Sequence, residues 1–405
     1  MMQPMAFRPL SGIRVLDLTS SLAGPTATEI LGALGADVVK IEHPGRGDEA
    51  RDWGPRFFEG GSVMFFSANA GKRSLALDLK SPGGLEVLFR LVGEADVVVQ
   101  SLRPGTAERL GIGPDELRAR NPRLVYASIG AFGRSGPLAS EPGYDPLMQA
   151  AAGIMSLTGE TDGHPVRVGV SLIDIGTGVW AALAIVAALH EGHGRTLDLS
   201  LYETALSLVP YQLVDVLAGG EPAGRHGTAF PLIVPYQVFE TADGELMIVA
   251  ANDRLYEKTC QALGVPELAA DERFATNPLR IANRGQLIPL LQERIATETT
   301  AALLARLRQA GVPASPVNDL AAVAEDEQLR ATGILQELGG RELVSPPFSA
   351  DGERIRYAGE PPLLGQHGRE LLAEAGYSEA EIDELAAAGV VGLGAVDPAR
   401  ELPAE

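Results

Sequence analysis

One carboxylate draws attention by its position. In the stretch SLIDIGTGVW, residues 171–180, Asp174 lies between an apolar run and the start of a long apolar helix. An ionised side chain among apolar neighbours is costly unless it is hydrogen-bonded, solvated or used in chemistry. Because Asp is a preferred N-cap, Asp174 could cap a helix that begins near Thr177 and mark the end of a strand. The alternative is a nucleophile on a strand-to-helix turn, and these residues by themselves favour the cap.

Basic residues that could bind an anionic ligand gather in one stretch. Two of the chain's lysines, Lys72 and Lys80, lie in GKRSLALDLK, residues 71–80, beside Arg73. This cluster is either a solvated strand edge or part of a phosphate-binding site. The formal net charge of −20 argues against nucleic acid as the main partner, because a phosphate backbone requires a basic face. A small anionic ligand bound by a local basic cluster stays compatible with that charge.

Motifs for several other ligands are missing. The loop after the apolar run IRVLDL lacks a G-x-G-x-x-G pattern, and Pro25 and Thr26 occupy the turn where backbone would approach a pyrophosphate. There is no P-loop, no H-E-x-x-H and no paired metal-ligand spacing, and the single cysteine, Cys260, excludes an internal disulfide. The sequence therefore predicts neither a nicotinamide or flavin cofactor nor a metal.

Short β-branched runs alternate with amphipathic helices through the first two hundred residues. Predicted strands cover residues 13–18, 37–42, 74–79, 96–102, 124–133 and 195–201, and predicted helices cover residues 25–36, 81–95, 113–122 and 177–192. Strands almost continuous in Val, Ile and Leu, alternating with helices, indicate a parallel sheet covered on both faces. The predicted fold class is therefore α/β with a Rossmann-like large domain, whose ligands gather at the carboxyl ends of the strands.

Changes in composition and in hydrophobic pattern along the chain predict its domains. Residues 1–227 form the first part of the large domain, residues 228–325 a smaller α+β domain, and residues 326–405 a return to the large domain with an acidic tail. Within the small domain, YQVFET and ELMIVAA are expected to pair through the turn Ala242-Asp243-Gly244. The N-terminus lacks a signal-peptide pattern, and no apolar run reaches the roughly 18 residues of a membrane span. We therefore expect a cytoplasmic protein with no membrane partner.

Nine segments in order, between Pro9 and about Gly376, carry a family resemblance. They are PLSGIRVLDLTSSLAGPTAT, LGALGADVVKIEHPGRGD, NAGKRSLALDLKSPGG, RPGTAERLGIG, NPRLVYASIGAFG, GYDPLMQAAAGIMSLTG, the Asp174 segment, GRTLDLSLYETAL and GVPASPVNDL. Together they resemble the family III coenzyme A transferases, the group that contains formyl-CoA transferase and the carnitine CoA-transferases. The resemblance implies a homodimer in which two ring-like subunits interlock.

The resemblance changes the interpretation of Asp174. The family's catalytic aspartate follows the G-Y-D segment and precedes a glycine-containing turn and a long apolar helix, so Asp174 takes the nucleophile's position. The implied reaction moves coenzyme A from an acyl-CoA donor to a carboxylic acid through aspartyl anhydride and aspartyl-CoA thioester intermediates. An ordinary Asp pKa of about 3.9 would leave ample margin for ionisation at neutral pH, even with partial burial.

Contacts with coenzyme A transfer position by position from the family. The resemblance assigns them to Ser21, Leu22, Ala23, His43, Leu77, Lys80, Ser101, Leu102, Arg103, Arg109, Leu110 and Tyr144. Ser101 and Leu102 stand where an Asn-Phe pair is usual. The basic members would supply the local positive charge that a phosphorylated substrate requires, while Lys72 and Arg73 could be structural. Acyl-CoA and a small carboxylic acid are the implied partners, with no nucleic acid and no metal.

Two alternatives stay open. The related α-methylacyl-CoA racemases use a histidine where this chain has Tyr144, and a glutamate where it has Asn252 beside Asp253. Tyrosine, with a pKa near 10, is a poor base at neutral pH, which makes the racemase the weaker interpretation. A non-catalytic CoA-binding paralogue would have no use for Asp174. The family's glycine-rich lid has no obvious copy, the nearest candidate being GRHGTAF, residues 224–230.

Overall fold

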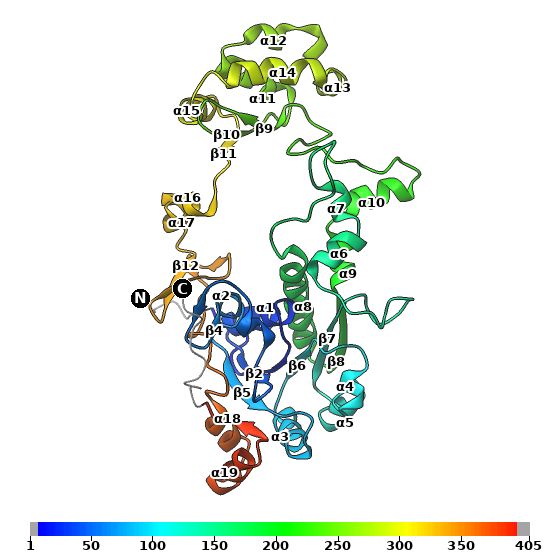
Figure 1. Cartoon of the computed structure of the whole chain (residues 1–405), viewed down its shortest axis with the longest axis vertical. Helices are drawn as coiled ribbons and strands as arrows, with labels where there is room; N and C mark the ends of the chain where they lie inside the picture. The colour runs from blue at the N-terminus through cyan, green and yellow to red at the C-terminus, as the bar shows by residue number, and fades with distance from the viewer. Residues whose placement is uncertain (1–6, 395–405) are drawn as a thin grey trace. The chain divides into compact units, whose positions relative to one another are not determined.

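The computed structural model of the chain describes residues 7–394. The chain divides into two compact units, whose elements are labelled in Figure 1. Within the described range, unit 1 takes in residues 7–152, Val168–Gly219 and residues 330–394, and unit 2 takes in Gly153–Arg167 and Gly220–Leu329. The small domain expected over residues 228–325 lies within unit 2. Unit 2 also takes in residues 153–167, 220–227 and 326–329.

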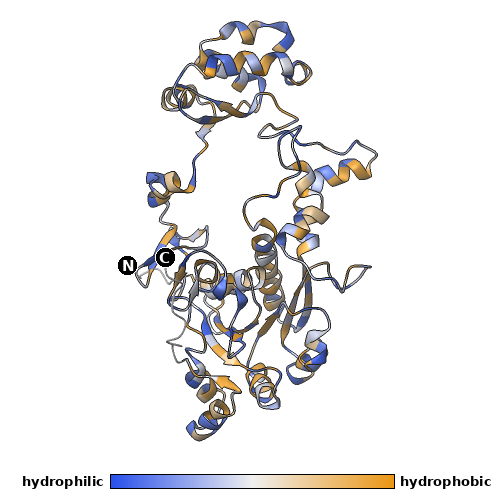
Figure 2. Cartoon of the chain, in the orientation of Figure 1, coloured by the Kyte–Doolittle hydropathy of each residue, from blue (hydrophilic) through white to orange (hydrophobic). Residues whose placement is uncertain are grey.

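Unit 1 is built on a seven-stranded sheet of order β16-β5-β2-β1-β6-β7-β8. The strands are β1 (Arg14–Leu18), β2 (Asp37–Glu42), β5 (Arg73–Leu77), β6 (Val97–Gln100), β7 (Val125–Gly130), β8 (Arg195–Ser200) and β16 (Val391–Gly392). All pairs are parallel except β16 with β5. The parallel sheet predicted from the β-branched runs is confirmed, and Figure 2 shows hydrophobic stretches within its strands.

Helices cover both faces of this sheet. One face packs in a core that includes Leu16 and Leu18 of β1, with residues of α3 (Pro82–Gly93), α5 (Pro114–Arg120), α18 (Gly368–Glu374) and α19 (Glu379–Ala387). Because side chains alternate along a strand, Asp17 points to the other face, where it meets Thr28 of α1 (Ala23–Ala33). Helix α1 packs against α8 (Leu172–Glu191).

The crossing of α1 and α8 requires a glycine. A Cβ atom on Gly178 of α8 would lie 2.8 Å from the carbonyl oxygen of Ala23 and 2.8 Å from Cβ of Thr26. Such contacts are too short for a real side chain, so only glycine permits this approach. The first turn of α1 is thereby held against α8 one turn beyond Asp174.

Unit 2 contains a three-stranded antiparallel sheet of order β11-β10-β9, covered by helices. The hairpin predicted here is confirmed: β9 (Tyr236–Glu240) pairs with β10 (Glu245–Val249), and β11 (Ala314–Pro316) adds to the other edge of β10. Its core joins these strands to α11 (Asp253–Leu263), α14 (Arg284–Ile295) and α15 (Thr300–Ala310).

The remaining elements are short. They are η1 (Glu49–Asp52), β3 (Phe57–Phe58), β4 (Gly61–Ser62), α2 (Val63–Phe66), α4 (Thr106–Arg109), α6 (Asp145–Ala151), α7 (Ile154–Leu157), α9 (Leu201–Ser207), α10 (Pro210–Leu217), α12 (Pro266–Ala270), η2 (Glu272–Phe274), α13 (Asn277–Ala282), α16 (Leu320–Ala324), α17 (Glu327–Thr332), β12 (Leu335–Leu338), β13 (Arg341–Val344), β14 (Ser349–Ala350) and β15 (Glu353–Arg354).

Two expectations about α8 are wrong. The helix begins at Leu172 and not near Thr177, and the apolar residues that precede it form no strand, so Asp174 lies inside the first turn. The chain also does contain an apolar segment of membrane-spanning length, because α8 has 20 residues and a mean hydropathy of 2.0. Seven residues of α8 are buried within this chain, among them Ile173, Ala181 and Ile185.

Candidate active site

The N-terminus of α8 is held by a second carboxylate. Oδ2 of Asp145, the first residue of α6, accepts hydrogen bonds from the backbone N–H groups of Ile173 at 2.7 Å and Asp174 at 3.2 Å. Ser171, at the N-cap position, makes no capping hydrogen bond with its side chain. The capping role considered for Asp174 therefore belongs to Asp145, which satisfies donors that a helix N-terminus leaves without intrahelical partners.

This arrangement changes the acidity of Asp174. Burial of the Asp174 carboxyl group, together with the negative charge of Asp145, raises its pKa to about 7. The ample margin expected from an ordinary carboxyl pKa is therefore absent, because the Asp174 carboxyl group titrates close to neutral pH. A carboxylate with a raised pKa is also a stronger nucleophile once it is ionised.

Asp145 is itself fixed by α6. Gln149, one turn later, donates from Nε2 to Oδ1 of Asp145 at 2.5 Å, and its Oε1 accepts the backbone N–H of Val168 at 2.8 Å. Both side chains are buried. The pair thus connects α6 to the segment that enters α8. Sequence reasoning missed these two residues, although an Asp and a Gln four positions apart on a helix could have indicated a shared task.

The loop between β1 and α1 lies beside the same helices. The backbone N–H of Ser20 donates to Oγ of Ser101 at 3.1 Å, and that of Ser21 donates to Oδ1 of Asp48 at 3.0 Å. Because Ala23 touches α8 at Gly178, this loop connects the Asp174 helix to the segment after β6. The structure therefore brings Ser21, Leu22, Ala23 and Ser101 together on the Asp174 side of the sheet.

Tyr144 precedes α6 directly and is 54% exposed. Its ring lies edge-on to that of Trp53, with the centroids 6.5 Å apart. The residue after it is Asp145, so this aromatic pair brings the end of η1 close to the residue that caps α8.

The other predicted contacts follow the carboxyl ends of strands that lie side by side. His43 follows β2, Lys80 follows β5, and Arg103 and Arg109 follow β6, and all four are exposed. Leu102 and Leu110 are partly buried, and Leu77 lies in the core at the end of β5. Because α8 leads into β8 and must run opposite to it, Asp174 starts from this same edge of the sheet.

The basic cluster of residues 71–80 is not one surface. Lys72 is buried and pairs with Asp17 at 3.0 Å, and Arg73 pairs with Asp37 at 2.7 Å and with Glu374 at 2.7 Å. Lys72 directly precedes β5 and Arg73 is its first residue, whereas Lys80 lies beyond its carboxyl end. Lys72 and Arg73 are thus structural. Lys80 is the cation of this stretch that faces solvent at the carboxyl ends of the strands.

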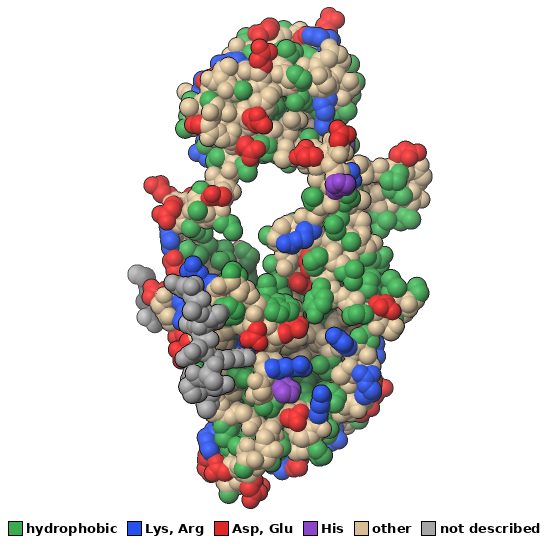
Figure 3. Space-filling model, viewed as in Figure 1, with side chains coloured by type: hydrophobic (Ala, Val, Ile, Leu, Met, Phe, Trp, Pro, Cys, Tyr) green, Lys and Arg blue, Asp and Glu red, His purple; other side chains and the backbone are tan. Residues whose placement is uncertain are grey.

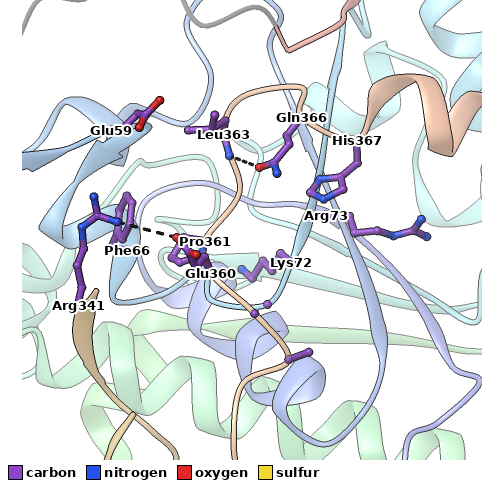
Figure 4. A pocket seen from close by; sticks show the side chains of 13 residues that line it. Glu59, Phe66, Lys72, Arg73, Arg341, Glu360, Pro361, Leu363, Gln366 and His367 are labelled. Atoms are coloured by element: carbon purple, nitrogen blue, oxygen red, sulfur yellow. Dashed lines mark hydrogen bonds and ion pairs between the residues drawn. The ribbon is translucent and has the colours of Figure 1, made fainter. Parts of the chain in front are cut away.

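Two hollows differ in their relation to this edge. One of about 250 Å³ lies at the carboxyl ends of β6, β7 and β8 and is lined by Leu102, Arg103, Ser128, Arg134 and Asp198 among others. A larger one of about 480 Å³ opens at the start of β5 and contains Arg341, Glu360 and His367 (Figure 4). The smaller hollow borders the predicted contacts, and its Arg134 was not anticipated from the sequence.

The residues considered for a racemase base and for a lid make structural contacts within unit 2. Asn252 accepts the N–H of Leu255 as the N-cap of α11, and Asp253 pairs with Arg280 at 2.7 Å. The lid candidate, residues 224–230, is held by a hydrogen bond from the backbone N–H of Gly227 to the carbonyl oxygen of Gly159 at 2.9 Å. Among the described residues, no group of three or more His, Cys, Asp or Glu side chains could hold a metal ion.

Comparison with known proteins agrees with this arrangement. Residues 10–368 match CoA-transferase family III. Succinyl-CoA:glutarate CoA-transferase of Mus musculus is 38% identical, covering 95% of this chain and 91% of the relative, and acetyl-CoA:oxalate CoA-transferase of Acetobacter aceti is 38% identical, covering 92% and 97%. A CAIB/BAIF family protein from Brucella suis has a solved structure that superimposes with a TM-score of 0.83 at 39% identity, covering 91% of this chain and 99% of that one. The chain belongs to CoA-transferase family III.

Proposed function

We propose that this enzyme moves coenzyme A from a short acyl-CoA to a small dicarboxylic acid, with Asp174 as the covalent nucleophile. The observation that carries the proposal is the placement of Asp174, a partly buried carboxyl in the first turn of α8 with Asp145 fixed against its backbone. A buried acid that neither caps its helix nor lies in the core is typical of a reacting group.

Four steps balance the reaction. The Asp174 carboxylate attacks the thioester carbon of the donor and expels the thiolate, which leaves a mixed anhydride. Attack of the thiolate on the aspartyl carbon forms an aspartyl thioester and releases the donor acid. The acceptor carboxylate attacks this thioester, expels the thiolate and forms a second anhydride. Attack of the thiolate on the acceptor's acyl carbon yields the new acyl-CoA and restores Asp174.

The substrate class follows from charge and from the relatives. Four exposed residues follow the carboxyl ends of the strands: His43, Lys80, Arg103 and Arg109. They would face the phosphates of coenzyme A, although the chain as a whole is acidic. Relatives are named for succinyl-CoA with glutarate, D-citramalate or mesaconate, and for acetyl-CoA with oxalate, all of them dicarboxylic acceptors. Succinyl-CoA with glutarate is therefore the first pair to test.

The proposal includes a homodimer. Ile175, Val179, Trp180 and Leu183 recur along one face of α8, and each is between 47% and 56% exposed. Figure 3 shows hydrophobic side chains gathered over the region of α8 and α10. A large apolar face of this kind marks an interaction surface, and a second copy of the chain would cover it. The family resemblance adds the expectation that the two subunits interlock.

Mass spectrometry tests the chemistry directly. Incubation with succinyl-CoA should leave the mass of a covalently bound coenzyme A on the peptide that contains Asp174, and glutarate should remove it. In deuterium oxide with a 2-methylacyl-CoA and no acceptor, the α-carbon should gain no deuterium, because this chain has Tyr144 and Asn252 at the positions where the racemases have a histidine and a glutamate. An unmodified protein, or rapid deuterium incorporation, would refute the transferase assignment.

A further inference from the structure

The loop that joins β1 to α1 has a strained backbone at its centre. Ser21 has a φ of +71°, in the left-handed region that residues other than glycine rarely adopt. Such a conformation persists only where the surrounding structure holds it in place. Neighbouring side chains are therefore expected to hold the backbone of Ser21 in this conformation. The function of the conformation depends on what the loop binds.

Hydrogen bonds from three directions hold this loop. Oδ1 of Asp48 accepts the backbone N–H of Ser21 at 3.0 Å, and Nζ of Lys40 donates to the carbonyl oxygen of Thr19 at 3.0 Å. On the other side, Oδ1 of Asp17 accepts the backbone N–H of Thr19 at 2.9 Å. Charged side chains thus fix both backbone polar groups of Thr19 and the backbone N–H of Ser21.

Two of these anchors form one buried ion pair. Nζ of Lys40 lies 2.8 Å from Oδ2 of Asp48, and both side chains are fully buried. Asp48 is oriented in turn by its own N–H, which donates to Glu42 at 3.0 Å, and by the N–H of Ala50, which donates to its Oδ1 at 2.9 Å. Loss of either charge would leave the other buried without its partner, so the pair acts as a unit.

We propose that the Lys40–Asp48 ion pair positions the loop of residues 19–21 for binding the acyl-CoA substrate. This inference rests on the proposed function, together with the contact with coenzyme A that the family resemblance assigns to Ser21. Lys40 and Asp48 are positioning residues, since both are buried and reach the substrate only through the backbone that they hold. Their loss should therefore weaken substrate binding while the chemistry at Asp174 continues.

The test compares the two kinetic constants. Asp48→Asn should raise the KM for succinyl-CoA by about tenfold or more, the effect of losing a charge-assisted hydrogen bond, with kcat changed by less than about threefold. Ser21→Gly removes the cost of the left-handed backbone. Added to Asp48→Asn, it should lower the KM relative to Asp48→Asn alone, a recovery that general destabilisation would not produce.

The control is Asp37→Asn, on the strand that carries Lys40. Asp37 lies at the amino end of β2 and pairs with Arg14 and Arg73. Its loss should lower the melting temperature and leave the KM unchanged. If Asp48→Asn does not accumulate as folded protein, Asp48→Glu keeps the charge and displaces the carboxylate, and it should also raise the KM.

The outcomes separate the two proposals. Calorimetric titration of the wild type with coenzyme A comes first, and absence of binding there would refute the proposed function itself. If the wild type binds, an unchanged KM in folded Asp48→Asn or Asp48→Glu, or an equal rise in Asp37→Asn, would overturn the positioning role.

Discussion

Oδ2 of Asp145 accepts a hydrogen bond from the backbone N–H of Asp174 at 3.2 Å, so two carboxylates lie at the start of one helix. One of them is buried and satisfies helix donors, and the other is left with a pKa raised to about 7. A helix N-terminus by itself favours a negative charge. Here the cap brings its own negative charge, and burial and Asp145 together oppose ionisation of Asp174.

Removal of the nucleophile should separate binding from chemistry. Asp174→Ala should lower the rate of transfer by more than about a hundredfold, because the covalent intermediates of the proposed mechanism form on the carboxyl group of Asp174. Coenzyme A should bind nearly as tightly as to the wild type, since the proposed contacts with its phosphates are made by other residues, such as Lys80 and Arg109. Rates are measured by separating the acyl-CoA products. Transfer at more than about a hundredth of the wild-type rate would exclude Asp174 as nucleophile.

The pH profile should report Asp174. Below a pKa of about 7, log(kcat/KM) should rise with pH, because only the ionised carboxylate attacks. Asp145→Asn removes a negative neighbour, so the rising limb should shift to lower pH. Asp115→Asn, which changes an exposed acid in the first turn of α5, should leave the limb in place. A limb that does not move in Asp145→Asn would contradict the coupling of the two carboxylates.

The same carboxyl should affect stability with a defined sign. Because the pKa of Asp174 is higher in the folded chain than its ordinary value of 3.8, the folded state binds more protons between about pH 4 and pH 7. Its contribution to the free energy of unfolding is therefore complete below pH 4 and lost as the pH rises through 7. Asp174→Asn should raise the melting temperature relative to wild type at pH 8 and not at pH 4. An equal difference at both values would show that the carboxyl is not buried as described.

Positive charge at the strand ends should determine affinity for the substrate. Lys80→Ala and Arg109→Ala should each raise the KM for acyl-CoA by about tenfold to a hundredfold if a phosphate contact is lost. Arg369→Ala is the matched control, because Arg369 is an exposed cation that pairs with Glu379 and Asp383 on α19. Unchanged KM values for both test variants would mean that these cations are only solvated.

The apolar face of α8 should mediate dimer formation. Leu183→Glu places a charge on a side chain that is 56% exposed, and it should lower the molar mass measured by light scattering from dimer to monomer or prevent accumulation of the protein. Val344→Glu, at a site 64% exposed on β13, should leave the mass unchanged. A monomeric wild type would refute the proposed dimer.

Much of unit 1 was predictable from the sequence, because periodic patterns determine elements and their order. The β-branched runs marked β1, β2, β5 and β6, and the hairpin of β9 and β10 followed from its turn residues. Burial on both faces needs apolar side chains at successive positions, so the strands of a parallel sheet can be recognised as short apolar runs in the sequence. The segments around Asp174 also identified the family without any knowledge of geometry.

Only the tertiary structure decided what the charged residues do. Lys72 and Lys80 look alike in the sequence, yet one is buried against Asp17 and the other faces solvent beyond the strand. The residues around Asp174 by themselves favoured a helix cap, a role that the structure gives to Asp145, 29 residues earlier in the chain. A pKa depends on burial and on charges brought close in space, and neither quantity is a property of neighbouring residues in sequence. For that reason the sequence could propose Asp174 as the nucleophile, whereas the acidity of Asp174 and the anchors of the Ser21 loop came from the fold.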